Sequence, residues 1–144
     1  MGHSGMIGLV VATHGRLAEE FLRTAEGIVG PLEQCEAVSV AAGASMEDAR
    51  ARLGEAVKRV DRGEGVLVLT DMFGGTPANL ALTFLDEKLE VVTGVNLPMI
   101  LKLATARQGE LALRAAAELV AGHGQKNITL ASELLRSRVQ KGRQ

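Results

Sequence analysis

Residues 66–79 read VLVLTDMFGGTPAN, and this stretch decides the fold class. Five apolar or β-branched residues come first, followed by an acidic residue, an apolar pair, two glycines and Thr76-Pro77. A continuous apolar run of this length is typical of a strand that is buried on both faces. Threonine followed by proline is a common helix start, with Thr76 as the N-cap. The stretch therefore predicts a strand, a glycine-rich loop and a helix in immediate succession.

Strand-like and helix-like segments alternate along the rest of the chain. The predicted strands cover 6–12, 36–40, 66–70 and 89–93; the predicted helices cover 15–29, 45–60, a segment from 76, and 98 to about 121 with a break near 108–109. Such alternation is typical of parallel sheets, because each helix returns the chain to the start of the next strand. We predict one α/β domain with a mostly parallel four-stranded sheet, in the order 2-1-3-4, and helices on both faces.

The two ends of the chain differ from this pattern. Residues 1–5, MGHSG, look like the remnant of a tag, so that the domain itself is expected over residues 6–135. Near its end, residues 128–131 predict a short fifth strand. Residues 136–144 are basic and polar, and we expect a frayed tail there.

The composition excludes several classes of function. The 144 residues carry a formal net charge of −1, which gives no electrostatic basis for binding nucleic acid or an anionic membrane. Three phenylalanines are the sole aromatic residues, which disfavours recognition by stacking on bases or sugars. Cys35 is the single cysteine, so an internal disulfide and a thiolate metal cluster are excluded. No apolar run reaches membrane-spanning length. We expect a cytoplasmic protein without membrane insertion, metal or other cofactor.

Polar side chains follow two of the predicted strands where each strand ends. His14 follows the first strand and Asp71 the third. In a sheet of order 2-1-3-4 these strands are neighbours, and a crevice opens between their carboxyl ends. A carboxylate that binds one ring nitrogen fixes the tautomer and leaves the other nitrogen free to attack. The pair therefore indicates a nucleophilic imidazole.

The loop after Asp71 adds the features of an anion site. Gly74 and Gly75 let the backbone approach a ligand closely. Thr76 supplies a hydroxyl, and the start of the following helix supplies free N–H groups and a partial positive charge. A nucleophilic imidazole that faces such a site favours phosphoryl transfer to histidine.

Simpler interpretations remain open for each residue alone. His14 is explained equally well as a polar residue that binds a loop carbonyl, and Asp71 as the cap of its own turn. The loop lacks both a Walker lysine and a spaced G-x-G-x-x-G motif, so nucleotide binding is weakly supported. His123 lies between glycines near a helix end, where capping explains it. Met72 and Met99 are interpreted as packing residues.

Three motifs together resemble the mannose-family EIIA domains of the bacterial phosphoenolpyruvate-dependent sugar phosphotransferase system (PTS). They are THG at 13–15, TDMFGGTPAN at 70–79 and TGVNLPM at 93–99. The resemblance implies that His14 accepts a phosphoryl group at Nε2 from the phosphocarrier HPr and passes it to a histidine of EIIB, while Asp71 holds the ring. It implies further that Gly74, Gly75 and Thr76 lie at the phosphoryl group, and that Thr13, Asn96, Pro98 and Met99 border the site.

The resemblance also implies a homodimer, in which a strand at 127–131 pairs with the sheet of the partner subunit. Such a strand would cover an exposed edge of the four-stranded sheet. The phosphotransfer subunits of dihydroxyacetone kinases are a second, related candidate. Outside phosphotransfer, a regulatory binding module and a phosphatase- or chelatase-like enzyme remain as alternatives. A phosphatase would need a basic cluster around the phosphate, and Arg16 is the one basic residue near His14 in the sequence.

Overall fold

The computed structural model describes residues 5–142, and the chain alternates between strands and helices as far as β4. In chain order the elements are β1 (Gly8–His14), α1 (Leu17–Val29), β2 (Cys35–Val40), α2 (Met46–Val60), β3 (Val66–Thr70), α3 (Thr76–Leu82), β4 (Leu89–Thr93), α4 (Leu97–Ala106), α5 (Leu113–Lys126) and α6 (Ala131–Gly142). The expected tag remnant lies outside the described residues, except for residue 5.

The four strands form one parallel sheet in the order β2-β1-β3-β4, which confirms the predicted topology. β1 is a central strand, and it continues past the predicted end at residue 12 to include Thr13 and His14. β3 ends at Thr70, beside Ala12 of β1 in the register. The carboxyl ends of β1 and β3 therefore lie side by side at one edge of the sheet.

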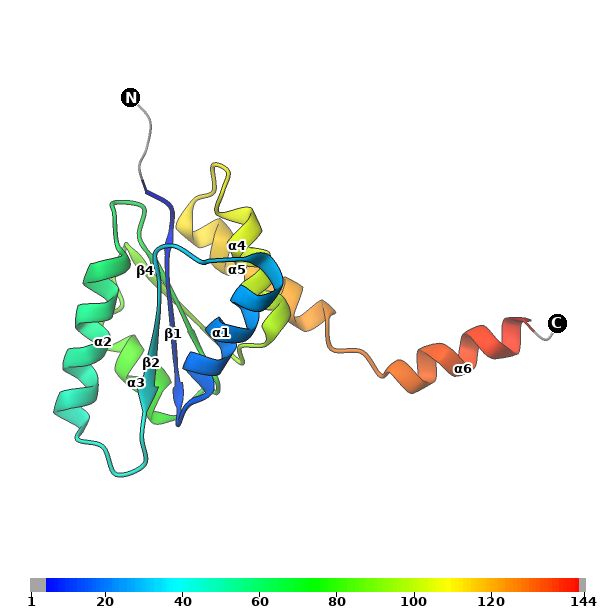
Figure 1. Cartoon of the computed structure of the whole chain (residues 1–144), viewed down its shortest axis with the longest axis horizontal. Coiled ribbons are helices and arrows are strands. Elements are labelled where there is room, and N and C mark those ends of the chain that lie inside the picture. Colours follow the sequence, from blue (N-terminus) through cyan, green and yellow to red (C-terminus); the bar gives the residue numbers. More distant parts are fainter. Residues whose placement is uncertain (1–4, 143–144) are drawn as a thin grey trace.

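Helices cover both faces of the sheet (Figure 1). Helices α1, α4 and α5 lie over one face and α2 and α3 over the other. Alternate residues of β1 supply the two cores: Leu9 and Val11 pack in the first, and Val10 and Ala12 in the second. This burial on both faces explains why the strands read as continuous apolar runs rather than as alternating patterns.

A buried polar clamp closes the opposite, amino-terminal edge of the sheet. Arg107, which follows α4, is 4% exposed, and its guanidinium donates to the carbonyls of Ile7 (3.0 Å), Gln34 (3.1 Å) and Glu33. Burial lowers the pKa of Arg107. The side chain of Gln34 donates to the carbonyls of Met6 and Val60, both at 2.9 Å. The clamp thus ties the starts of β1 and β2 to the ends of α2 and α4.

The carboxyl-terminal segment differs from the prediction. Residues 128–130 form no strand, and the side chains of Ile128 and Leu130 are exposed. The predicted frayed tail is instead part of α6, which projects away from the rest of the molecule (Figure 1). A strand needs a neighbouring strand for its hydrogen bonds, whereas a helix satisfies its backbone internally, so in the single chain residues 128–130 are irregular and the residues after them form α6. Residues 143–144 of the predicted tail lie outside the described residues.

Candidate functional site

His14 and Asp71 meet at the carboxyl ends of β1 and β3. The Oδ2 atom of Asp71 lies 2.9 Å from the ring Nδ1 of His14 and also accepts a hydrogen bond from the His14 backbone N–H at 3.2 Å. The same carboxylate oxygen therefore anchors both the backbone and the ring. Because a carboxylate can only accept, this contact assigns the ring proton to Nδ1.

Burial differs between the two partners of this pair. The side chain of His14 is 45% exposed, whereas that of Asp71 is 16% exposed. The second oxygen of Asp71, Oδ1, is buried and makes no hydrogen bond within residues 5–142. The carboxylate is thus held beneath a ring that a second protein can reach, and it acts on that ring through Oδ2.

The loop that follows Asp71 passes directly against the ring. Gly74 has a φ of +84°, in the left-handed region that favours glycine. Asn79 holds the loop from α3, because its backbone N–H donates to the Gly75 carbonyl at 3.0 Å and its side-chain amide lies 3.5 Å from the Gly74 carbonyl. The predicted cap was wrong by one position: Gly75 is the N-cap and Thr76 is the first residue of α3. Of the predicted phosphoryl-binding residues, Gly75 lies against the His14 ring, and Gly74 and Thr76 are its neighbours in the chain.

The loop after β1 is fixed from two sides. The hydroxyl of Thr13 accepts a hydrogen bond from the backbone N–H of Ala18 at 2.7 Å and thereby holds the start of α1. The N–H of Gly15 donates to the carbonyl of Val40, at the end of β2, at 2.9 Å. These contacts hold the residues on either side of His14, so its backbone has little freedom to move.

The loop between β4 and α4 lies beside the end of β3, where the N–H of Val95 donates to the Thr70 carbonyl at 2.9 Å. The side chain of Asn96 caps α4 by accepting from the Met99 N–H at 3.2 Å, and it donates to the Gly124 carbonyl of α5 at 3.1 Å. Met99 is 2% exposed and belongs to the core. Pro98 is partly buried in the first turn of α4. Asn96 and Met99 thus join α4 to α5, and their side chains make no hydrogen bond to His14 or Asp71 in the described chain.

Three apolar side chains in the segments that follow β1 and β3 face solvent. The exposed fractions are 51% for Leu17, 55% for Met72 and 76% for Phe73. Met72 was predicted to be a packing residue, and this prediction was wrong because its loop projects beyond the end of the sheet. The sequence did contain a signal for this exposure, since two consecutive apolar residues in a turn cannot both pack into the core.

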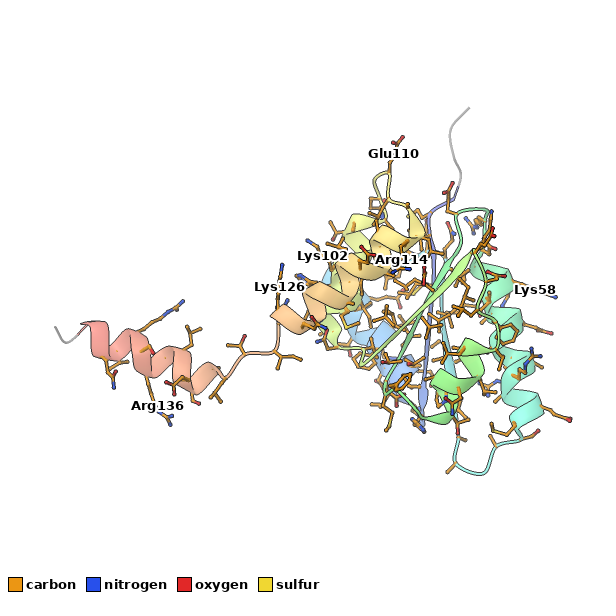
Figure 2. All side chains as sticks on the ribbon, turned by 180° about the vertical axis from the view of Figure 1, so that it is seen from behind. Lys58, Lys102, Glu110, Arg114, Lys126 and Arg136 are labelled. Atoms are coloured by element: carbon orange, nitrogen blue, oxygen red, sulfur yellow. The ribbon has the colours of Figure 1, made fainter. Side chains whose placement is uncertain are left out.

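Charged side chains are distributed over the surface. The side chain of Arg16 is 79% exposed, and its Nε lies 3.9 Å from a carboxylate oxygen of Glu19. Figure 2 shows Lys58 of α2 on the opposite side of the domain from Lys102 of α4 and Lys126 of α5. Within residues 5–142, no three histidine, cysteine, aspartate or glutamate side chains are grouped in a way that could hold a metal ion. No helix in this part of the chain is long and apolar enough to cross a membrane.

Comparison with known proteins adds independent information. Residues 8–131 match the family model EIIA-man, described as the PTS system fructose IIA component. The chain is 34% identical over 106 residues to the PTS system mannose-specific EIIAB component of Escherichia coli (strain K12), a match that covers 72% of this chain and 33% of that protein. The chain thus spans about a third of the length of that relative. It is also 29% identical over 132 residues to the PTS system fructose-specific EIIA component of Bacillus subtilis (strain 168), with 90% of each covered.

Solved structures show the same architecture. The mannose/sorbose specific IIA subunit of the phosphotransferase system from Enterococcus faecalis aligns with a TM-score of 0.78 at 32% identity, over 86% of this chain and 93% of that one. The PTS IIA protein associated with the fucose utilization operon of Streptococcus pneumoniae aligns with a TM-score of 0.83 at 28% identity, over 93% and 99%.

Proposed function

The chain belongs to the EIIA-man family of PTS IIA components, and from this premise we propose that it is a phosphocarrier whose phosphoryl group is held by His14. The family gives it a phosphotransfer role in sugar uptake. In the proposal, phospho-HPr is the donor, a histidine of an EIIB protein is the acceptor, and the exchange takes place in the cytoplasm. The observation that carries the proposal is the 2.9 Å contact between His14 Nδ1 and Asp71.

This contact supports Nε2 as the reacting atom. With the proton held on Nδ1, the lone pair of Nε2 attacks the phosphorus of phospho-HPr. The bond from phosphorus to the donor's ring nitrogen breaks, and its electron pair stays on the donor. The positive charge that develops on the His14 ring is stabilised by Asp71, whose side chain is largely buried. Transfer to EIIB is the same displacement, with the phospho-His14 ring as the leaving group.

The apolar surface made by Leu17, Met72 and Phe73 is the proposed docking surface for both proteins. These side chains are exposed on the segments that follow His14 and Asp71, and the His14 ring is itself half-exposed, so an approaching protein would bury them. Since donor and acceptor must each reach Nε2, they would occupy this surface in turn rather than together.

A carrier must also keep its phosphoryl group until it meets its acceptor. The nearest carboxylates in sequence already have partners: Glu19 accepts from the Ser39 hydroxyl at 3.3 Å, and Glu20 accepts from Arg23 at 2.8 Å. Asp71 is bound to the ring. General-base activation of water typically contributes ~10²–10⁴-fold. We therefore expect phospho-His14 to persist at neutral pH and to discharge quickly to EIIB.

The test is to isolate the phosphorylated protein at neutral pH, add a chelator, and follow phosphate release with and without EIIB. Persistence alone followed by rapid discharge to EIIB supports the carrier. Rapid release of inorganic phosphate without a partner would indicate a phosphatase and contradict the proposal.

Self-association is a separate part of the proposal. Ile128 is 78% exposed and Leu130 is 70% exposed, on a segment that leads away from the domain. We expect a homodimer in which residues 127–131 pair with the partner's sheet, because edge strands need cover. Sedimentation at micromolar concentration should therefore give a dimer, and truncation before Asn127 should weaken it. A full-length monomer under these conditions would contradict this expectation.

A further inference from the structure

The backbone of Gly75 lies in direct contact with the ring of His14. A Cβ atom added to Gly75 would lie 2.5 Å from Cε1 and 3.1 Å from Nε2 of that ring. Carbon atoms in favourable contact are about 3.5–4.0 Å apart. Position 75 therefore has no room for a side chain while the ring keeps its present orientation.

The conformation of Gly75 does not itself require glycine. Its φ of −82° and ψ of 168° describe extended backbone that any residue can adopt. The neighbouring Gly74 is the opposite case, because its φ is +84° and a Cβ atom there would meet nothing within 4 Å. Glycine is thus favoured at position 74 because of its backbone φ, and at position 75 because a side chain there would collide with the His14 ring.

Glycine at position 75 also forgoes a stabilising helix cap. Gly75 is the N-cap of α3, and no side chain caps this helix. Serine, aspartate and asparagine are preferred at N-caps because their side chains accept hydrogen bonds from the first turn. Any of them would need the space that the ring occupies. The contact with His14 therefore leaves α3 without the side-chain cap that one of these residues would supply.

We infer that Gly75 is a positioning residue that, together with Asp71, holds the His14 ring in a slot and fixes the direction of Nε2. Asp71 holds the Nδ1 edge at 2.9 Å, and the Gly75 backbone lies against the edge formed by Cε1 and Nε2. A side chain at position 75 would push the ring and break its contact with Asp71. Misplacement of a reacting group by about 1 Å can cost on the order of 10²-fold in rate. This inference rests on the proposed function of His14.

Met72 forms a further wall of the slot. Its Cγ atom lies 3.3 Å from the Cβ position of Gly75, slightly farther than the ring. The Met72 side chain is 55% exposed and flexible, so it can move away from an added methyl group. The ring cannot do so without losing Asp71. The contact with the His14 ring, rather than that with Met72, therefore decides the effect of a side chain added at position 75.

A double-mutant cycle tests this contact in the full chain. Wild type, Gly75→Ala, His14→Ala and the double variant are compared by thermal unfolding. We expect Gly75→Ala to lower Tm in the wild type and to leave Tm unchanged or higher in the His14→Ala background, where the space is free. If Gly75→Ala alone fails to fold while the double variant folds, the contact is equally supported. Equal Tm shifts in both backgrounds, or a double variant that also fails to fold, would overturn the inference.

Two further readouts separate positioning from stability. Gly75→Ala should accept a phosphoryl group from phospho-HPr roughly 10²-fold more slowly than the wild type, and ¹⁵N NMR should show that the Nδ1–H contact with Asp71 is lost. Gly27→Ala is the matched control, because a Cβ atom there meets nothing within 4 Å, and it should behave as wild type. A wild-type rate for Gly75→Ala would contradict the inference. The Gly75→Ala/Met72→Ala protein removes Met72 as the second neighbour of position 75, and a wild-type ring signal in this protein would also contradict the inference. Failure of the proposed function is a distinct result, namely normal labelling of His14→Ala.

Discussion

An Asp71→Asn protein is expected to fold like the wild type but to accept a phosphoryl group about 10²–10⁴ times more slowly. The amide oxygen of asparagine can still accept the hydrogen bond that the His14 backbone N–H makes at 3.2 Å, so the loop should keep its shape. The amide carries no charge, however, and cannot stabilise the positive charge that develops on the ring. It can also turn its NH₂ group toward Nδ1 and select the wrong tautomer.

This effect is measured by rapid-quench labelling with phospho-HPr, with circular dichroism as the check on folding. Asp61→Asn is a suitable control, since Asp61 caps the exposed turn after α2 and accepts a hydrogen bond from Gly63. The control should label at the wild-type rate. If the Asp71→Asn protein labels as fast as this control, Asp71 serves only the turn and has no part in phosphoryl transfer.

Arg107→Met is expected to lower the free energy of unfolding by about 2–6 kcal/mol. The guanidinium donates two buried, charge-assisted hydrogen bonds, to the carbonyls of Ile7 and Gln34, and the loss of each costs about 1–3 kcal/mol, although the Gln34 carbonyl keeps its bond from the Leu9 N–H. Methionine fills the space but donates no hydrogen bond. Because the free energy of unfolding of small domains is only about 5–15 kcal/mol, the substitution is expected to remove a large part of it.

Urea unfolding gives the free energy directly. Arg114→Met is the matched control, because Arg114 is 76% exposed and its ion pairs with Glu118 and Glu90 lie at the surface. Surface pairs contribute about 0–1 kcal/mol, so the control should change little. An Arg107→Met protein within 1 kcal/mol of the wild type would show that the clamp is not a main support of the sheet.

The sequence was sufficient to predict the sheet and the meeting of His14 with Asp71. Each strand is buried on both faces and is therefore apolar throughout, and the order 2-1-3-4 places the ends of β1 and β3 together. These are local patterns combined with a topological rule, which is why they can be recognised without coordinates.

Other features depend on contacts between residues far apart in the chain. Arg107 binds the carbonyl of Ile7, 100 positions away, and an arginine beside a loop reads as a solvated residue. That Asn96 and Met99 border the site stays a prediction, and the sequence did not show that their side chains join α4 to α5. The role of Gly75 was also hidden, because the motif alone does not distinguish a glycine needed for its φ from one needed for space.

The carboxyl-terminal segment differs from the predicted strand for another reason. Residues 128–131 have the composition of a strand, but a strand forms only where an edge is offered to it. In the single chain residues 128–130 are irregular and lead into α6, which begins at Ala131. Pairing with a second subunit stays a prediction that the sedimentation experiment tests.

Peptide mapping of the phosphorylated protein by mass spectrometry tests most directly whether His14 carries the phosphoryl group. Wild type and His14→Ala are incubated with phosphoenolpyruvate, enzyme I and HPr, and are digested at alkaline pH. We predict one phosphoryl group on the wild-type peptide that contains His14, lost on brief acid treatment, and none on the variant. A phosphoryl group on another residue, or undiminished labelling of His14→Ala, would contradict the proposed function.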